Sequence, residues 1–274
     1  MTSLHQLRRR WRAWRLPAGQ RAFLQQPAAD RPAGESSTSA LRVLVVGIYL
    51  SEKPHRVPHL IEAFAAGRHR VDQVWVALGN GPQPPAHAEI EHLRWDGMAP
   101  KFVILNQLLA VRDLQTYDYL LISDDDIALC PGFMDAYLAW IRRCDFSIAQ
   151  PARAPHSYKD HRIALQRCWV KARQTCFVEI GPLLSLDRAA RRHLLPFDES
   201  SPMGWGYDFV WPLLAQQQGL RMGIVDATPI DHSYRPQSAT YSRDANREVA
   251  ERFLRAHPHL RRCEAYRTVR RYYR

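Results

Sequence analysis

Three adjacent carboxylates are the residues of this sequence best suited to chemistry. Asp124, Asp125 and Asp126 directly follow the hydrophobic segment 117–123, which predicts a buried strand. Ligands of open α/β sheets bind at the carboxyl ends of strands. Neighbouring anions repel one another unless a cation offsets them, and carboxylate oxygens suit Mn²⁺ or Mg²⁺. The pattern therefore favours a metal site over its structural alternative, a solvated acidic turn before the next helix.

Two later segments also contain residues that could bind a ligand or take part in catalysis. Gly204 and Gly206 flank Trp205, which predicts a tight loop whose indole forms a wall for a sugar ring. Asp208 follows this loop and is either a partly desolvated base or a helix-start carboxylate beside core aromatics. His232 follows a predicted strand at 223–226, and a neutral imidazole suits Mn²⁺ better than Mg²⁺. We expect His232 to complete the metal site.

Several single residues are further candidates. Lys101 begins the helix before the acidic strand and can neutralise a phosphate, although a solvated lysine is the plain alternative. Glu179 is one carboxylate among apolar residues, and it either contacts sugar or acceptor hydroxyls or satisfies buried backbone donors. Tyr49, shortly after the first predicted strand, is a candidate for nucleotide binding, and Asp125 is a candidate for substrate binding.

The order of the predicted elements indicates how these residues are held. Strands and helices alternate along the chain, which favours an α/β fold with a mostly parallel sheet flanked by helices. The predicted strands are 41–47, 71–78, 117–123, 146–150, 176–180 and 223–226. The predicted helices are 57–66, 101–111, one that starts after Pro131, 187–195 with Asp187 as its cap, and one within 204–218 that stops at Gly219.

Charge divides the chain into three parts. The net charge is +11, of which residues 1–40 contribute +5 and residues 243–274 contribute +6, whereas residues 41–242 hold 21 basic and 21 acidic residues. We therefore predict a basic N-terminal tail (1–40), a folded domain (41–242) and a basic helical C-terminal tail (243–274). A nucleic-acid enzyme would carry its basic surface on the folded core, so nucleic acid is not an expected partner.

The N-terminal residues carry a separate expectation. Residues 1–16 place apolar side chains at helical spacing among arginines, which fits either an interfacial helix on anionic lipid or a disordered basic tail. The sequence shows neither an apolar stretch long enough to span a bilayer nor the apolar core of a signal peptide. We expect a cytoplasmic protein, with peripheral attachment at the inner face of the membrane as a hypothesis.

The ordered motifs resemble the DUF707 family, whose members are similar to GT-A glycosyltransferases, enzymes with a Rossmann-like nucleotide-sugar-binding fold. The likeness covers roughly residues 41–240. It is carried by Lys101, 117–119, 124–126, 147–152, 177–179, 204–208 and 225–232.

The resemblance implies a role for each matching residue. Asp124 and Asp126 match the outer acids of the D-x-D motif, of which the last holds the metal and the first tends to meet the nucleotide. His232 matches the late histidine that completes the metal shell. The segment 204–208 is similar to the G-W-G-x-[DE] element of inverting transferases, in which the acid is the catalytic base. That element often has two acids in succession, whereas Phe209 follows Asp208 here.

These features predict a metal-dependent glycosyltransferase that moves a sugar from a nucleotide diphosphate, with UDP expected, to an acceptor hydroxyl by an inverting course. Two alternatives stay open. One is a non-catalytic nucleotide-sugar or carbohydrate-binding protein. The other is a sugar-phosphate nucleotidyltransferase, although the segment after the first strand has one glycine rather than a Gly-rich basic loop. The sequence has no P-loop, no G-x-G-x-x-G and no G-x-S-x-G motif, which argues against a P-loop NTPase, a Rossmann dehydrogenase and an α/β-hydrolase respectively.

Overall fold

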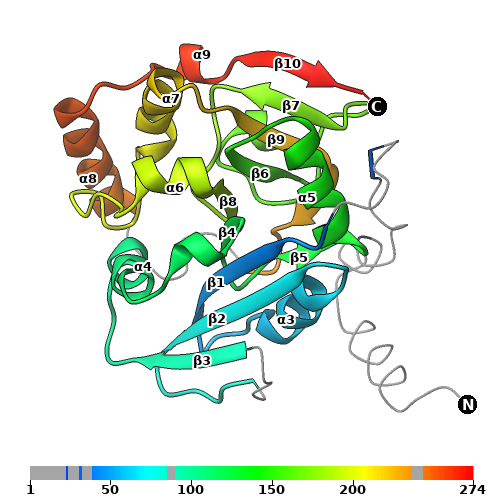
Figure 1. Cartoon of the computed structure of the whole chain (residues 1–274). Helices are drawn as coiled ribbons and strands as arrows, with labels where there is room; N and C mark the ends of the chain where they lie inside the picture. The colour runs from blue at the N-terminus through cyan, green and yellow to red at the C-terminus, as the bar shows by residue number, and fades with distance from the viewer. Residues whose placement is uncertain (1–22, 24–30, 33–38, 85–89, 236–242, 274) are drawn as a thin grey trace, which may run out of the picture.

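The computed structural model describes residues 23, 31–32, 39–84, 90–235 and 243–273. Within them, one mixed sheet has the strand order β10-β7-β9-β6-β8-β4-β1-β2-β3, with β5 paired to β9 (Figure 1). The strands are β1 (Arg42–Leu50), β2 (Arg70–Leu78), β3 (Ile90–Trp95), β4 (Tyr119–Ser123), β5 (Ala128–Leu129), β6 (Ile148–Arg153), β7 (Ala172–Thr175), β8 (Leu183–Asp187), β9 (Met222–Asp231) and β10 (Thr268–Tyr272).

The sheet is parallel where the sequence predicts alternating strands and helices. The neighbours β3, β2, β1 and β4 are all parallel, and β6 pairs in parallel with β9. Antiparallel β8 joins these two parallel groups by lying between β4 and β6. The expected α/β fold, with a central sheet flanked by helices, is confirmed.

Helices cover both faces of the sheet. They are α3 (Val57–Ala65), α4 (Lys101–Ala110), α5 (Phe133–Arg143), α6 (Arg188–Leu194), α7 (Tyr207–Gln217), α8 (Arg243–Ala256) and α9 (Arg262–Ala265).

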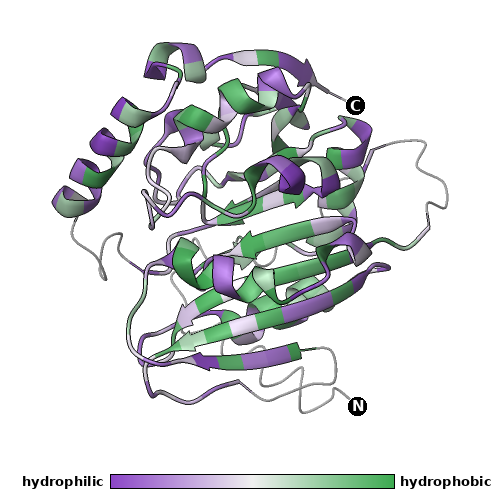
Figure 2. Cartoon of the chain, turned by 60° about the vertical axis from the view of Figure 1, so that its left-hand side comes forward, coloured by the Kyte–Doolittle hydropathy of each residue, from purple (hydrophilic) through white to green (hydrophobic). Residues whose placement is uncertain are grey.

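The alternation of side chains along β1 explains the two layers of helices. Val43 and Val45 face one hydrophobic core with α3 and α5, whereas Leu44 and Val46 face the other with α4, α6, α7 and α8. Figure 2 shows hydrophobic residues concentrated along the central strands between these layers. A strand that is buried on both faces reads as a continuous apolar run, which is the pattern at the start of the folded domain.

Three helix boundaries follow from local sequence as expected. The carboxylate of Asp187 accepts the backbone N–H of Ala190 at 2.7 Å and caps α6. Gly206 precedes α7 with a φ of +100°, and Gly219 follows that helix with a φ of +67°. Both backbone conformations favour glycine, so the loop that leads to Asp208 is set by the local sequence.

Two local expectations are wrong. Residues 176–180 are not a strand, because β7 ends at Thr175 and the backbone N–H of Glu179 donates to the side chain of Gln150 instead of to a neighbouring strand. The segment after residue 242 is not helical throughout, since β10 follows α9 and pairs antiparallel with β7. Main-chain pairing therefore ties the C-terminal segment to the sheet.

Part of the N-terminal expectation lies outside the described residues, including the amphipathic segment 1–16. Two described residues of the predicted tail contact the folded domain. Phe23 is 1% exposed and belongs to the core on the α5 face. Arg31 forms an ion pair with Asp135 of α5. No helix among the described residues is both long and apolar enough to cross a bilayer.

Candidate active site

The acidic triplet begins where β4 ends, at the middle of the sheet. Asp124 is held there by its backbone N–H, which donates to the carbonyl of Pro182 at 2.7 Å. Beyond the triplet, the short strand β5 pairs antiparallel with the end of β9, so that Ala128 lies opposite Asp231. This pairing brings His232, the residue after β9, beside Asp126.

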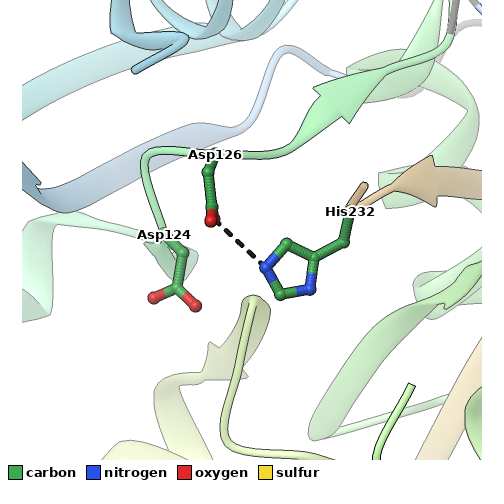
Figure 3. A group of neighbouring side chains, drawn as sticks. All are labelled: Asp124, Asp126 and His232. Atoms are coloured by element: carbon green, nitrogen blue, oxygen red, sulfur yellow. Dashed lines mark hydrogen bonds and ion pairs between the residues drawn. The ribbon is translucent and has the colours of Figure 1, made fainter. Parts of the chain in front are cut away.

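Asp124, Asp126 and His232 form a cluster of possible metal ligands. One ligand atom from each lies within 4.8 Å of the others, and His232 Nε2 is 3.1 Å from Asp126 Oδ1. Figure 3 shows the imidazole pointing toward the two carboxylates. Two oxygens and one imidazole nitrogen suit Mn²⁺. Ligands at about 2.1 Å from one ion are at most about 4.2 Å apart, so these separations are close to those that one ion requires.

Cationic side chains hold the three carboxylates. Lys101 Nζ lies 2.6 Å from Asp124 Oδ1. Arg235 forms an ion pair with Asp125 and lies 3.3 Å from Asp126 Oδ2. Each acidic side chain therefore has a basic partner, which offsets the repulsion among three neighbouring anions.

The carboxyl groups of Asp125 and Asp126 have opposite pKa shifts. Burial raises the pKa of Asp125 to about 6, although Arg235 opposes the shift. Burial also acts on Asp126, but the hydrogen bond and charge of His232, with those of Arg235, outweigh it and lower the pKa of that carboxyl. Asp125 Oδ2 also accepts the backbone N–H of Leu50 at 3.1 Å. Protein donors therefore engage Asp125, and its assignment to substrate stays a prediction.

Arg153 links the metal-ligand cluster to a buried carboxylate. Its NH1 group lies 2.8 Å from His232 Nδ1, and its Nε donates to Glu179 Oε2 at 2.7 Å. A guanidinium has no acceptor, so Nδ1 accepts here and the ring proton lies on Nε2, toward Asp126. Metal ligation through Nε2 requires that proton to move to Nδ1, and Arg153 must then release Nδ1.

Glu179 keeps one oxygen for a further partner. Its side chain is buried and its Oε1 has no hydrogen-bond partner among the described residues. Burial raises its pKa, against the opposing charge of Arg153. A buried acceptor without a donor is costly, and a substrate hydroxyl can satisfy it. The contact of Glu179 to substrate stays a prediction.

Asp208 lies in the first turn of α7 and is 7% exposed. Burial raises its pKa to about 7, and the negative charges of Glu179 and Asp160 act in the same direction. A carboxyl group with this pKa can take up a proton near neutral pH. His161 Nε2 lies 3.5 Å from its Oδ2.

One cavity of about 780 Å³ connects these groups. Trp205 is half-buried at its wall, beside Gly206, and Tyr49 lines it although the side chain is only 1% exposed. Every site residue named from the sequence lines this cavity: Tyr49, Lys101, Asp124, Asp125, Asp126, Glu179, Trp205, Gly206, Asp208 and His232. The structure thus gathers residues that are up to 183 positions apart. Their individual roles stay predictions.

Sequence reasoning missed five charged or titratable residues of this cavity: Arg153, Asp160, His161, Arg235 and Arg262. Three of them contact carboxylates that were named from the sequence. Arg153, His161 and Arg235 line it and contact Glu179, Asp208 and Asp125 respectively. Arg153 and His161 carry no local signal, because their partners lie 26 and 47 positions away. Arg235 could have been predicted from the sequence, because it lies three positions after the candidate ligand His232.

Comparison with known structures identifies the fold. A mannosyltransferase from Pyrobaculum calidifontis, PcManGT, in complex with GDP-Man and Mn²⁺, matches with a TM-score of 0.52 and 16% identity over 93% of this chain and 73% of that one. GalNAc-T7 with UDP, GalNAc and Mn²⁺ matches with a TM-score of 0.52 and 12% identity over 74% of this chain. This chain spans 45% of the GalNAc-T7 chain. S. aureus TarS 1–349 with UDP-GlcNAc matches with a TM-score of 0.50 and 12% identity, over 76% and 64% of the two chains.

The chain therefore has a GT-A-like glycosyltransferase fold. At these identities the likeness establishes the fold alone. No family model matches the sequence, so membership of the DUF707 family stays a prediction. No curated protein matches it either.

Proposed function

We propose that this protein is a metal-dependent glycosyltransferase that transfers a sugar from a nucleotide diphosphate to an acceptor hydroxyl. One observation carries the proposal: two features line the same cavity of a glycosyltransferase fold. The first is the cluster of Asp124, Asp126 and His232, and the second is the carboxyl group of Asp208, whose pKa is about 7. The first feature suits a divalent cation and the second suits a base. A non-catalytic binding protein does not require a base.

Asp126, Asp124 and His232 would hold Mn²⁺, or Mg²⁺ with a weaker fit to the histidine. When bound, the ion would supply charge stabilisation to the leaving diphosphate. Lys101 already forms an ion pair with Asp124, and Arg235 with Asp126, and both can turn to phosphate oxygens. Tyr49 would contact the nucleotide, and Trp205 would stack on a sugar ring.

Asp208 would act as the base of a single displacement. Its carboxylate takes the proton of the acceptor hydroxyl while that oxygen forms a bond to the anomeric carbon. The bond from this carbon to the diphosphate oxygen breaks, and its electron pair leaves with the nucleoside diphosphate. Glu179, through its unpartnered oxygen, would hold a hydroxyl of sugar or acceptor. This course inverts the anomeric centre.

The decisive experiment is isothermal titration of UDP into the protein, with Mn²⁺ and with EDTA. We expect Mn²⁺-dependent binding by the wild type and its loss in Asp126→Ala. Asp96→Ala, which removes an exposed carboxylate, is the control and should bind like the wild type. GDP follows as the second nucleotide, because one matching structure holds GDP-Man. Failure of UDP, GDP, CMP and dTDP to bind would refute the proposal.

Asp208→Asn separates the transferase from a binding module. In a transferase this variant keeps metal-dependent nucleotide binding and loses sugar transfer by roughly 10²- to 10⁴-fold. In a non-catalytic binding protein, affinity alone would change. The anomeric configuration of the product, read by NMR, decides between the inverting course and a retaining one.

We also propose peripheral attachment to an anionic membrane surface through the segment 1–16, in keeping with a cytoplasmic protein. Its alternating apolar residues and arginines are the sole support. Liposome flotation tests it: the full chain should float with anionic vesicles, whereas a 41–274 truncation should not. Equal behaviour of the two proteins would refute the attachment.

A further inference from the structure

His161 lies in the candidate active site, where nothing in the sequence placed it. Its Nε2 is 3.5 Å from Asp208 Oδ2, and both residues line the large cavity. Three aromatic rings surround its imidazole: Phe177 at 4.7 Å, Tyr266 at 5.7 Å and Phe209 at 6.1 Å between ring centroids. These rings come from the loop after β7, the residue after α9 and helix α7, so tertiary packing fixes the imidazole plane.

Hydrogen bonds on the other side of the ring fix where its proton lies. Arg262 Nε is 3.0 Å from the hydroxyl of Tyr266, and that hydroxyl is hydrogen-bonded to His161 Nδ1. A guanidinium only donates, so the phenol oxygen accepts from Arg262 and its single hydrogen is available to His161. The arrangement in which the tyrosine hydroxyl uses this hydrogen makes Nδ1 the acceptor of the imidazole.

The imidazole is neutral at pH 7, because burial lowers the pKa of His161 to about 4. A neutral ring carries one proton, and with Nδ1 accepting from Tyr266 that proton lies on Nε2. The Nε2–H group therefore faces the carboxyl group of Asp208. Every hydrogen in this chain of contacts points in one direction, from Arg262 through Tyr266 and His161 to Asp208.

We propose that His161 is a positioning residue for Asp208, held by Tyr266 and Arg262 in the tautomer whose Nε2–H lies toward Asp208 Oδ2, with 3.5 Å between the nitrogen and the oxygen. This inference rests on the proposed function, in which Asp208 is the base. When this contact shortens to hydrogen-bond length, the Nε2–H group orients the carboxylate and favours its charged form. His161 keeps its proton throughout, and the acceptor's proton goes to the second oxygen of Asp208.

The surroundings of Asp208 explain why such a donor is needed. Glu179 and Asp160 raise its pKa, as burial does, while backbone N–H groups of Gly206 and Asp208 itself lower it. The charged and titratable groups that face Asp208 are thus two carboxylates, the His161 imidazole and the Tyr266 phenol. Of these side chains, His161 is the one that presents a hydrogen toward Asp208 Oδ2.

The C-terminal segment has a role in this arrangement. Tyr266 and Arg262 belong to residues 243–273, which main-chain pairing of β10 with β7 ties to the sheet. A segment that sequence composition marks as a basic tail therefore contributes to the setting of the candidate base. Substitution of Tyr266 should therefore affect proton transfer rather than binding of the sugar donor.

Long-range ¹H–¹⁵N NMR of the imidazoles tests the proposal without any activity. The His161 signals are assigned by their loss in His161→Gln. At pH 7 we expect a neutral ring with Nε2 protonated and Nδ1 unprotonated. In Tyr266→Phe the Nδ1 donor is missing, so the other tautomer should become populated. A wild-type ring that is protonated at Nδ1, or at both nitrogens, would overturn the proposal.

Kinetics supplies the second readout once a donor and acceptor are known. Tyr266→Phe should lower kcat by about 10- to 100-fold, as for other residues that orient a functional group. The acid limb of the pH profile should move upward, because the carboxylate loses support for its charged form, while the KM for donor stays constant. Tyr272→Phe, in β10 of the same segment, is the control and should match the wild type. An unmoved acid limb in Tyr266→Phe would refute the positioning role.

These outcomes separate the two proposals. If metal-dependent nucleotide binding is found but the His161 tautomer is wrong, the transferase stands and the positioning role falls. If no nucleotide binds, the transferase falls, while the NMR result still decides whether the chain of hydrogen bonds exists.

Discussion

Asp208→Asn should stabilise the folded protein at alkaline pH while it removes the candidate base. The folded carboxyl group has a pKa of about 7, chiefly through burial. An aspartate in an unfolded chain has a pKa of about 3.9. Between these two values the folded protein keeps a proton that the unfolded chain has released, so ionisation of Asp208 opposes folding as the pH rises.

The size of the effect follows from the difference between the two pKa values. A difference of about 3 units at about 1.4 kcal/mol per unit gives an effect on the order of 4 kcal/mol. The free energy of unfolding of the wild type should therefore fall from pH 4 to pH 7 by up to this amount through Asp208 and stay level above pH 7. Asparagine cannot ionise and has nearly the same shape, so the variant escapes this loss.

Denaturant unfolding of wild type and variant across pH 4 to 8.5 measures the effect. The stabilisation of Asp208→Asn should approach a few kcal/mol at pH 8, on the order of a 10 °C rise in Tm, and vanish near pH 4. Asp96→Asn removes an exposed carboxylate and controls for net charge; its difference from wild type should be small at all pH values. An Asp208→Asn variant that is no more stable than wild type at pH 8 would show that the carboxyl group is not desolvated, and the assignment of a base would lose its support.

Four further substitutions test the packing of the folded domain. Arg173→Met should destabilise the protein by about 3–5 kcal/mol in denaturant unfolding, because it leaves the carboxylate of Asp226 buried and unpaired. Adding Asp226→Asn should recover part of this loss, and no recovery would contradict the pairing. Gly204→Ala should cost about 1–3 kcal/mol or more, since the new Cβ would lie 2.2 Å from the ring of Phe102 at a φ of +79°. Gly219→Ala has a φ of +67° but open space, so calorimetry should show a smaller loss of about 1 kcal/mol, and equal losses would refute the steric argument.

The acidic site could be predicted because its main signal is local. A buried strand that is followed by three carboxylates predicts two things from one short segment. It predicts that the carboxylates lie at the end of a sheet strand, and that they suit a divalent cation. The glycines around Trp205 likewise fix a loop, because the φ values of +79° and +100° at Gly204 and Gly206 favour residues without a side chain. Such features depend on neighbours in sequence, so they can be predicted even when the pairing of distant strands is not known.

Other elements could not be found in this way. The strand β8 lies antiparallel between β4 and β6, and its neighbours are set by pairing rather than by its composition. The wrong strand at 176–180 has a β-prone sequence, but its backbone bonds to the Gln150 side chain. Short apolar segments have no preference strong enough to override such tertiary contacts.

The sequence by itself determined the class of fold, the loop around Trp205 and the identity of the candidate metal ligands, because strand burial, backbone conformation and ligand chemistry are local properties. The tertiary structure alone decided which charges meet. The pairing of β5 with β9 sets His232 against Asp126, and the return of the C-terminal segment to the sheet brings Tyr266 to His161. Interactions between charges and donors depend on distance in space, and burial sets their strength, so residues such as Arg153 acquire a role only when the chain is folded.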